Sequence, residues 1–314
     1  MRKRLESRAG AFCYPDMSLV DSHVHLYPPE ADPDPSAWAA ARGEKHWAVL
    51  CTRRRKDGRL VQSLPTLRDL LIEMDRASVT RAVLLGWYWE NFETCVEQNR
   101  FYAQCIKAHP DRLSAFATFH PAAGNEAVLT EVRRAHGEGL CGLGELSPHS
   151  QGYGIDDPAF TAVLELAAEL KLPVNLHVTD PESARYPGWV STPLEDFVAI
   201  SARHPTTTFI LAHWGGRLPL LIPSARNLEN VYYDTAASPL LYDETIWTKF
   251  LAVVPKERVL FGSDFPLNLY PKLDASPGMS RLVAELHRSG LGADELAAVA
   301  GANAKRALGV GRGR

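Results

Sequence analysis

Eight short apolar runs, separated by stretches with helical periodicity, constrain the fold of this 314-residue chain more than any other feature. Nearly continuous apolar runs without strict alternation are typical of parallel strands buried on both faces. The expected strands are Leu19–Leu26, Ala82–Tyr88, Leu113–His120, Gly139–Leu146, Pro173–Val178, Thr208–Trp214, Val231–Ala236 and Val259–Phe265. Eight strands that alternate with helices predict a single-domain α/β fold, the (β/α)8 or TIM barrel. A doubly wound open sheet is the alternative.

The segments between these strands place apolar residues at helical spacing. The expected helices are Thr66–Val79, Asn91–Ala108, Glu126–His136, Ala159–Leu170, Leu194–Arg203, Glu244–Val253, Met279–Ser289 and about Asp294–Leu308. Asp157-Pro158 and Thr192-Pro193 match the pattern of an N-cap residue followed by a first-turn proline. The link over Leu218–Asn227 has the weakest pattern.

One connection is much longer than the others. Residues 27–65, between the first strand and its helix, are rich in proline and charge and have no clear periodicity. Long loops in compact domains are usually functional or disordered, and in a barrel this one would lie over the carboxyl-terminal mouth. We therefore expect an N-terminal extension over residues 1–17, a barrel over 18–309 that contains this loop insertion, and a tail over 310–314.

Composition excludes several classes of partner. The net charge of −3 gives no global sign of binding to nucleic acid or to an anionic membrane. No run of about 18 apolar residues is present to span a membrane. The N-terminus has no apolar core of a secretory signal, and the five cysteines have no zinc-finger spacing. We expect a cytoplasmic protein with free thiols that acts on a small-molecule substrate.

Residues of metal-ligand type stand at the carboxyl-terminal ends of the strands, where barrel enzymes build their sites. The first strand ends in Asp21-Ser22-His23-Val24-His25, and its two histidines share one strand face. The others are Glu145, His177, His213 and Asp264, on strands four, five, six and eight. A buried charge or imidazole is costly without a partner, and a metal ion would serve all six side chains. Imidazole with carboxylate suits zinc, which we expect, and also manganese or iron.

Aromatic residues at the mouth are candidates for substrate contact. Trp87 and Trp89 end the second strand and could pack against a hydrophobic substrate. Packing under the long loop is an equal alternative for both. Trp38 and Trp47 in that loop could complete the pocket.

Two polar residues are further candidates for substrate contact. His120 follows the third strand and could face the mouth, although a structural role is at least as well founded. Arg217 follows Trp214-Gly215-Gly216 and could bind a substrate carboxylate with two hydrogen bonds, or form a structural ion pair. The basic run 53–56 is interpreted as a solvated loop, since the net charge is close to neutral.

The order of these motifs resembles the amidohydrolase superfamily over about residues 18 to 309. The segments are DSHVHL, GLGEL, NLHV, LAHWGG and FGSDFP, which begin at residues 21, 142, 175, 211 and 261. Within that superfamily, 73–77 and the C-terminal segment 301–309 resemble the amidohydrolase-related (amidohydrolase 2) branch. This branch includes the aminocarboxymuconate-semialdehyde decarboxylase group. A homodimer is plausible from the same resemblance.

The resemblance implies roles for the candidate ligands. His23 and His25 would bind the deeper metal ion together with Asp264, and His177 and His213 would bind a second ion. Glu145 would bridge two ions, as in the TatD-like hydrolases. The decarboxylase branch is typically mononuclear, and its strand-six histidine acts as an acid or base. One or two ions per chain are therefore both open.

The leading hypothesis is hydrolysis by metal-activated hydroxide, because a metal lowers the pKa of bound water from about 15.7 to about 7. The hydroxide would attack the carbonyl centre of an ester, lactone, amide or C–C bond, and Asp264 would transfer the proton. His213 is the other candidate catalytic residue. The alternative is a mononuclear, non-oxidative decarboxylase of an aromatic or unsaturated carboxylic acid. A non-catalytic binding protein is a third possibility, which an idle buried ligand set disfavours.

Overall fold

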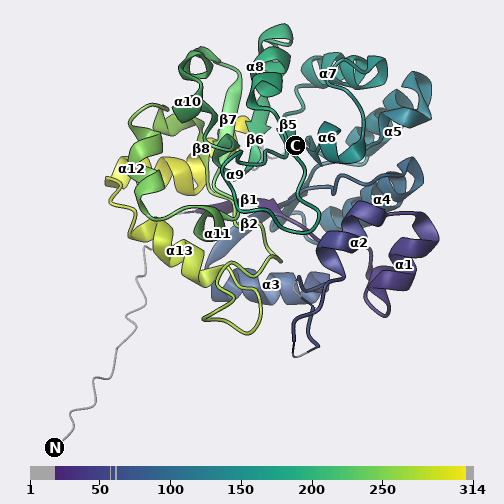
Figure 1. Cartoon of the computed structure of the whole chain (residues 1–314), viewed down its shortest axis with the longest axis horizontal. Coiled ribbons are helices and arrows are strands. Elements are labelled where there is room, and N and C mark those ends of the chain that lie inside the picture. The colour runs from purple at the N-terminus through teal and green to yellow at the C-terminus, as the bar shows by residue number, and fades with distance from the viewer. Residues whose placement is uncertain (1–17, 57, 61, 309–314) are drawn as a thin grey trace, which may run out of the picture.

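The computed structural model describes residues 18–56, 58–60 and 62–308; the expected N-terminal extension (1–17) and tail (310–314) lie outside the described residues. Eight parallel strands form the centre of the molecule, surrounded by helices (Figure 1). They are β1 (Leu19–Val24), β2 (Val79–Leu84), β3 (Leu113–Ala115), β4 (Leu143–Leu146), β5 (Val174–Leu176), β6 (Phe209–Leu211), β7 (Val231–Asp234) and β8 (Val259–Leu260).

The strands close into a barrel through two short joints. Ladders connect β1 to β3 and β4 to β8 in sequence order. A parallel bridge between Ala117 and Leu143 joins the two ladders on one side, and one between Val24 and Phe265 joins them on the other. The amide of His25 donates to the Phe265 carbonyl at 2.7 Å, which strengthens the second joint. The predicted barrel is thus confirmed, and an open doubly wound sheet is excluded.

Helices follow the strands around the outside. The larger ones are α3 (Leu67–Arg76), α4 (Phe92–Ala108), α5 (Asn125–Gly137), α7 (Pro158–Leu170), α8 (Leu194–Arg203), α12 (Thr245–Leu251) and α13 (Ser280–His287). The C-terminal helical segment comprises α14 (Ala293–Ala297), a π turn (Ala298–Ala302) and α15 (Asn303–Ala307). Single turns are α6 (Pro148–Gln151), α9 (Ala212–Gly215), α10 (Leu218–Leu221) and α11 (Ser238–Leu241). The 3-10 turns are Pro29–Ala31, Pro121–Ala123, Pro223–Asn227 and Lys256–Arg258.

The two predicted helix starts have different outcomes. The Asp157 carboxylate accepts hydrogen bonds from the amides of Ala159 and Phe160 and caps α7, as predicted. The second prediction is wrong by one residue, because Pro193 is itself the N-cap of α8. The Thr192 hydroxyl instead accepts from the Thr179 amide at 2.8 Å, so it fastens the loop after β5.

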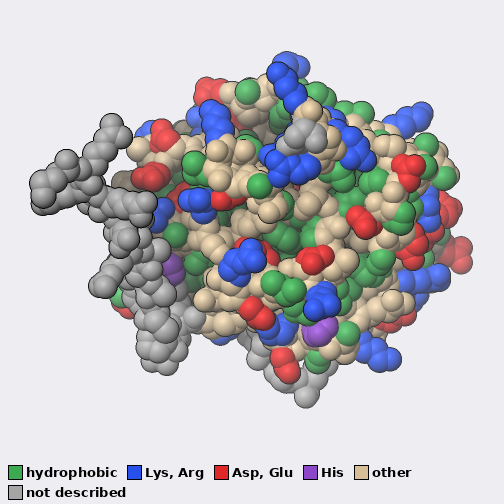
Figure 2. Space-filling view, turned by 90° about the horizontal axis from the view of Figure 1, so that it is seen from below, with side chains coloured by type: hydrophobic (Ala, Val, Ile, Leu, Met, Phe, Trp, Pro, Cys, Tyr) green, Lys and Arg blue, Asp and Glu red, His purple; other side chains and the backbone are tan. Residues whose placement is uncertain are grey.

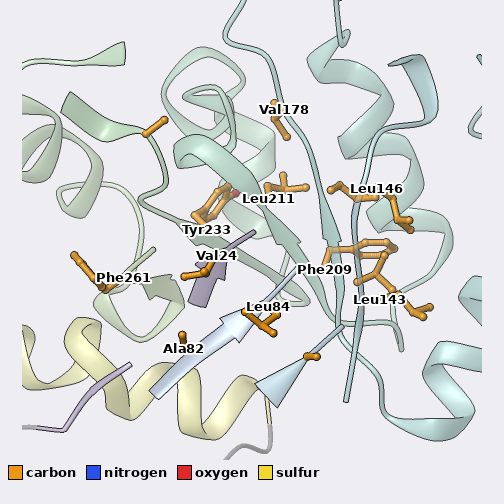
Figure 3. Packing of buried hydrophobic residues seen from close by; sticks show 14 of the residues in the cluster. Val24, Ala82, Leu84, Leu143, Leu146, Val178, Phe209, Leu211, Tyr233 and Phe261 are labelled. Atoms are coloured by element: carbon orange, nitrogen blue, oxygen red, sulfur yellow. The ribbon is translucent and has the colours of Figure 1, made fainter. Parts of the chain in front are cut away.

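Alternate residues of the strands build two apolar layers. Ala82 and Leu84 belong to the layer between strands and helices, part of which Figure 3 shows. Val83 lies between them in the sequence and points to the opposite face. The interior layer it joins contains Val20, Val83, Leu85, Phe116, Ile210 and Leu260, with Ala304 and Leu308 packed against it. Side chains therefore fill the barrel below the site, and each large one contributes about 1.5–3 kcal/mol.

The long connection over 27–65 is more ordered than the sequence indicated. It contains two helices, α1 (Pro35–Arg42) and α2 (Lys45–Cys51). Asp34 caps α1 and Gly43 ends it with a φ of 74°, a conformation that favours glycine. These cap signals were readable, but helices of eight and seven residues are too short to establish a period.

This connection lies over the mouth, as predicted, because Leu50, Arg53 and Gln62 line the cavity that contains the candidate ligands. Within the described part of the chain, no helix is both long and apolar enough to cross a membrane. Figure 2 shows basic and acidic side chains interspersed over one face of the molecule, so neither sign dominates it.

Candidate active site

The barrel brings the six predicted ligands to one place from five different strands. His23 lies in β1 and His25 just after it, and Glu145 lies in β4. His177, His213 and Asp264 follow β5, β6 and β8. All six side chains are largely buried. The Asp264 side chain is 13% exposed and is therefore more accessible than those of His23, His25 and Glu145.

Four donor atoms form the first group. His23 Nε2 lies 3.1 Å from His25 Nε2. Glu145 Oε2 lies 3.8 and 3.5 Å from these two nitrogens, and Asp264 Oδ1 lies 3.7 and 3.6 Å from them. Ligand atoms about 2.0–2.2 Å from one ion are themselves roughly 3 to 3.5 Å apart. The donor set therefore has the chemistry and the spacing for one divalent ion.

The hydrogen-bond partners of the two histidines direct both Nε2 atoms toward the same point. His23 Nδ1 lies 3.0 Å from Asp234 Oδ2, and His25 Nδ1 lies 3.0 Å from the Leu85 carbonyl. Both partners only accept hydrogen bonds, so each Nδ1 carries a proton and each Nε2 presents a lone pair. Two facing lone pairs at 3.1 Å would repel each other, so either a proton on one Nε2 or a metal ion lies between them.

The surrounding charge favours a divalent cation over a single proton at this point. Burial lowers the pKa of His23, but the carboxylates of Asp234 and Glu145 outweigh it and raise the pKa to about 10. Burial raises the pKa of Asp264, which sits beside Glu145. A single proton would leave most of this carboxylate charge uncompensated, whereas a divalent ion would neutralise it.

A second group shares Glu145 with the first. Glu145 Oε1 lies 2.9 Å from His177 Nδ1 and 3.4 Å from His213 Nε2, and the two ring nitrogens are 3.2 Å apart. His213 Nδ1 faces the Ala236 carbonyl at 3.1 Å, so its Nε2 has a lone pair. One proton on His177 Nδ1 satisfies this group, which can therefore hold either a metal ion or a hydrogen-bonded proton.

Gly144 lets the backbone of β4 pass close to that of β5. A Cβ at position 144 would lie 2.3 Å from the Asn175 carbonyl oxygen, and the φ of 117° also favours glycine. The carboxylate is buried, which raises its pKa, but His177 and His23 outweigh this and hold the pKa well below its usual range. Glu145 is therefore anionic and reaches both groups.

Asp234 at the end of β7 is a functional candidate that the sequence analysis missed. Its Oδ2 accepts from His23 Nδ1 at 3.0 Å and from Asn175 Nδ2 at 3.1 Å. Its Oδ1 accepts from the amides of His213 and Ala236 at 3.1 and 3.0 Å. The side chain is fully buried. The readable signal was an aspartate at the end of an apolar strand, the same signal that identified the others.

His213 stands on a strained turn. Residues 213–217 all have φ between 57° and 63°, the left-handed region. The Arg217 guanidinium holds the end of this turn with hydrogen bonds of 2.5 and 2.9 Å to Asp180 and 2.6 Å to Glu182. The Tyr242 hydroxyl donates to Asp180 at 2.9 Å and to the His213 carbonyl at 3.4 Å. Arg217 thus adopts the structural ion pair that was the alternative to substrate contact.

A cavity of about 570 Å³ opens over both groups. Trp87, Tyr88 and Tyr186 line it together with Glu145, His177, His213 and Asp264. This size suits a small-molecule ligand with an aromatic ring.

The other predicted contacts lie elsewhere. Trp89 and His120 are absent from the described lining of this cavity. Trp89 is fully buried and donates to Gln98 at 2.6 Å, and His120 contacts the Gln151 carbonyl at 3.0 Å. Trp38 and Trp47 pack with Trp89 in the aromatic cluster of the long connection. Trp89 therefore packs under the long loop, which was the alternative to substrate contact.

The chain is similar to one family of known sequences and to many solved structures. A family profile described as Amidohydrolase matches residues 20–310. No protein in the search of curated sequences matches the chain.

Decarboxylases are among the similar solved structures. 5-Carboxyvanillate decarboxylase from Sphingomonas paucimobilis has 19% identity and a TM-score of 0.69, over 94% of this chain and 99% of the other. 2,6-Dihydroxybenzoate decarboxylase from Rhizobium has 17% identity and a TM-score of 0.65, over 93% and 99%. 5-Carboxyvanillate decarboxylase from Novosphingobium aromaticivorans, complexed with manganese and 4-hydroxy-3-methoxy-5-nitrobenzoic acid, has 15% identity and a TM-score of 0.70, over 94% and 96%. At these identities the likeness shows the fold alone.

Proposed function

This chain belongs to the amidohydrolase family, and we propose that it is a metal-dependent, non-oxidative decarboxylase of an aromatic or unsaturated carboxylic acid. The comparisons favour this alternative over the hydrolysis that the sequence analysis put first, since the solved structures described above are decarboxylases of aromatic acids.

One observation carries the proposal: the two groups of donors differ in what they need. The first has three carboxylates, those of Asp234, Glu145 and Asp264, around two imidazole nitrogens 3.1 Å apart, and this negative charge favours a divalent cation. The second is satisfied by one proton on His177 Nδ1, which lies 2.9 Å from Glu145 and 3.2 Å from His213. Decarboxylation of this kind uses a metal ion to bind the substrate and a proton to replace the carboxylate, and the two groups would supply one of each.

The residues divide the work as follows. His23, His25 and Asp264 would hold the ion, with Glu145 as a further ligand. A divalent ion there would bind and polarise the oxygens of the substrate. Manganese is our choice because it is present in the Novosphingobium decarboxylase structure, and zinc suits the same donors. Trp87 and Tyr88 would hold the ring of the substrate in the cavity.

His213 would deliver the proton. Its Nε2 faces the cavity group formed with Glu145 and His177, and its Nδ1 is fixed by the Ala236 carbonyl. The C–C bond to the carboxylate breaks, its electron pair stays on the substrate carbon, and carbon dioxide leaves. The proton on His177 Nδ1 would pass to His213 Nε2, 3.2 Å away, and from there would form the new C–H bond.

The second candidate is a binuclear hydrolase. It is favoured by Glu145, whose two oxygens face the two groups, as a bridging ligand would. In that case His177 and His213 would hold a second ion, and water would enter the product.

Metal analysis and isotope incorporation separate the two. We would purify the protein without added metal or chelator and measure metal per chain for wild type and for Glu145→Gln. We would then assay hydroxybenzoic and unsaturated acids in D2O. The proposal predicts about one ion per chain, carbon dioxide release and one deuterium in the product. About two ions, a clear loss in Glu145→Gln and oxygen from water in the product would replace it with the hydrolase.

A variant of the proton donor sharpens this test. His213→Gln should keep the metal and lower the decarboxylation rate by roughly 10²- to 10⁴-fold. His149→Gln is the matched control, because His149 pairs with Asp196 at 2.8 Å and should leave the rate unchanged. Loss of a metal ion in His213→Gln would contradict the assignment of His213 as a proton donor.

A further inference from the structure

Exposed apolar side chains line the outer part of the cavity. The two donor groups at its inner end are largely buried, whereas Leu240 of α11 is 44% exposed and Tyr186 in the loop after β5 is 40% exposed. Leu50 of α2 and Leu267, which follows β8, line the same cavity. We call these four side chains the apolar rim. Four different segments of the chain thus present apolar surface to one opening.

Exposed apolar side chains are concentrated at this opening. Among the described residues, six large apolar side chains are exposed, and two of them, Tyr186 and Leu240, belong to the apolar rim. A third, Val49, lies beside it, since a Cβ at Gly188 would be 3.4 Å from Val49 and 2.7 Å from Leu50. Single exposed apolar side chains are ordinary on a protein surface, whereas a group of them at a cavity is typical of a binding site. The apolar rim is therefore suited to contact an apolar group of a ligand.

The segments that carry the apolar rim are held in place by the protein itself. The His46 ring donates to the Gly188 carbonyl at 2.8 Å and joins α2 to the loop after β5. Trp214 Nε1 donates to Ser238 Oγ at 3.0 Å and joins α11 to the turn after β6. An apolar group that enters the cavity would therefore meet a preformed wall, so little ordering entropy opposes its binding.

The charged side chains in this part of the cavity tolerate an apolar neighbour. Asp180 and Glu182 are bound by the Arg217 guanidinium. Arg185 lies over a tryptophan ring at 4.2 Å. Arg53 is exposed, and its aliphatic stem can flank an apolar group while its guanidinium stays in water. An apolar group in the outer cavity would therefore leave none of these charges buried without a partner.

We propose that the apolar rim binds an apolar extension of the substrate, an alkyl chain of several carbons or a second ring, which points away from the carboxylate at the metal ion. This inference rests on the proposed function for the position of that carboxylate. The cavity of about 570 Å³ falls within the roughly 300–1,000 Å³ of pockets that enclose drug-sized ligands, which are larger than a single ring. The substrate class is an alkyl- or aryl-substituted aromatic or unsaturated monocarboxylic acid.

Probes that differ only in chain length test the apolar rim without any turnover. We would load the full-length protein with manganese and titrate it calorimetrically with benzoate and with 4-ethyl-, 4-butyl- and 4-hexylbenzoate. Affinity should rise by roughly two- to fourfold for each methylene that the apolar rim covers, with one probe molecule bound per chain. The heat-capacity change should become more negative along the series, and moderate salt should leave the gain in affinity unchanged.

A variant of the apolar rim localises the effect. Leu240→Asn should reduce the preference for 4-hexylbenzoate over benzoate by roughly three- to tenfold, because it removes apolar surface from the opening. Leu221→Asn is the matched control. Leu221 ends α10, is 40% exposed and is absent from the described lining of the cavity, so this variant should keep the full preference.

Several results would overturn the inference. They are equal affinities along the series, no binding of any probe at millimolar concentration, and equal losses of preference in Leu221→Asn and Leu240→Asn. A wild-type dimer that Leu240→Asn separates into monomers in analytical ultracentrifugation would also overturn it, because a second copy of the chain would then cover the apolar rim. Carbon dioxide release is measured separately, so failure of the decarboxylase proposal leaves the gain with chain length readable.

Discussion

Asp234 orients two of the site histidines at once. Its Oδ2 accepts from His23 Nδ1 at 3.0 Å, and its Oδ1 accepts from the His213 amide at 3.1 Å. The first contact sets the tautomer of His23, and the second fixes the start of the left-handed turn. Partners that hold metal-binding histidines in this way usually matter almost as much as the ligands.

Asp234→Asn should weaken metal binding by roughly 10- to 100-fold. The Asp234 carboxylate accepts hydrogen bonds through both oxygens, whereas an asparagine amide has only one acceptor oxygen. Metal titration followed by calorimetry measures this. Asp243→Asn is the control, since Asp243 is exposed and bonds Thr245 at the start of α12. Unchanged metal affinity in Asp234→Asn would show that His23 keeps its tautomer without the carboxylate.

Gly144 is a position where the backbone leaves no space for a side chain. Gly144→Ala should destabilise the protein by about 1–3 kcal/mol or more, because its Cβ would meet the Asn175 carbonyl at 2.3 Å and φ is 117°. Gly137→Ala is the matched control, with nothing within 4 Å of the added Cβ at the end of α5. Denaturant unfolding compares the two. A Gly144→Ala protein as stable as the control would mean that β4 and β5 separate at little cost.

At the scale of elements, the long connection after β1 behaves as a small helical layer with its own aromatic core. Trp47 on α2 is 1% exposed and lies 5.2 Å from the Trp38 ring and 5.7 Å from the Trp89 ring, centroid to centroid. The same helix places Leu50 on the cavity. The packing of Trp47 thus supports one wall of the site.

Trp47→Ala should therefore lower the free energy of unfolding by about 3–5 kcal/mol and weaken the binding of benzoate in the cavity. Val49→Ala on the same helix is the control, since Val49 is 43% exposed and should change stability by less than about 0.5 kcal/mol. Thermal unfolding measures the stability, and calorimetric titration of the manganese-loaded protein with benzoate measures the binding. If Trp47→Ala leaves both unchanged, α2 is not anchored by this cluster.

The loops after β5, β6 and β7 are joined by the Asp180 carboxylate. Asp180 is buried, which raises its pKa, but hydrogen bonds from Arg217, the Glu182 amide and Tyr242 outweigh this and lower the pKa below its usual 3.8. Because the pKa is lower in the folded state, the stabilisation is present above pH 3.8 and disappears as the pH falls through the folded value.

Asp180→Asn should accordingly be less stable than wild type at neutral pH, and the difference should shrink below about pH 4. Urea unfolding of both proteins across this range tests the sign. A difference that stays constant with pH would mean that the ionised carboxylate contributes nothing beyond its hydrogen bonds.

At the scale of the whole molecule, the donor set ties the barrel together. Its members come from β1 and β4 and from the segments after β5, β6 and β8, so an ion held there would link both ladders. An ion that binds only the folded protein stabilises it by about 2.7 kcal/mol at a hundredfold excess over Kd.

Removal of metal by a chelator should lower Tm by roughly 5 to 10 °C, and manganese should restore it. Scanning calorimetry before and after chelation measures the shift. The double variant His23→Ala, His25→Ala should show the lower Tm with or without manganese. An unchanged Tm in the chelated wild type would argue against an ion in the first group.

Local patterns were sufficient to predict the barrel and to select six residues that the fold brings together. A buried parallel strand is recognisable from its own few residues, and parallel strands of one barrel present their carboxyl ends at one face. Any residue of metal-ligand type at the carboxyl end of a strand therefore lies near the others at the mouth of the barrel. The strand ends show the limit: β2 ends at Leu84, so Trp89 packs in the aromatic cluster, whereas Trp87 belongs to that cluster and also lines the cavity.

The tertiary structure alone decided which contacts these residues make. Arg217 is bound by Asp180, 37 positions away, whereas Arg53 in a run that looked merely solvated lines the cavity. The tautomer of His23 depends on Asp234, 211 positions away. A hydrogen bond or ion pair is gained or lost when the distance between its atoms changes by about an ångström. A local sequence pattern does not determine the distance between atoms that lie so far apart in the chain. The sequence therefore determined the barrel and the candidate residues at its mouth, and the tertiary structure determined how those residues pair.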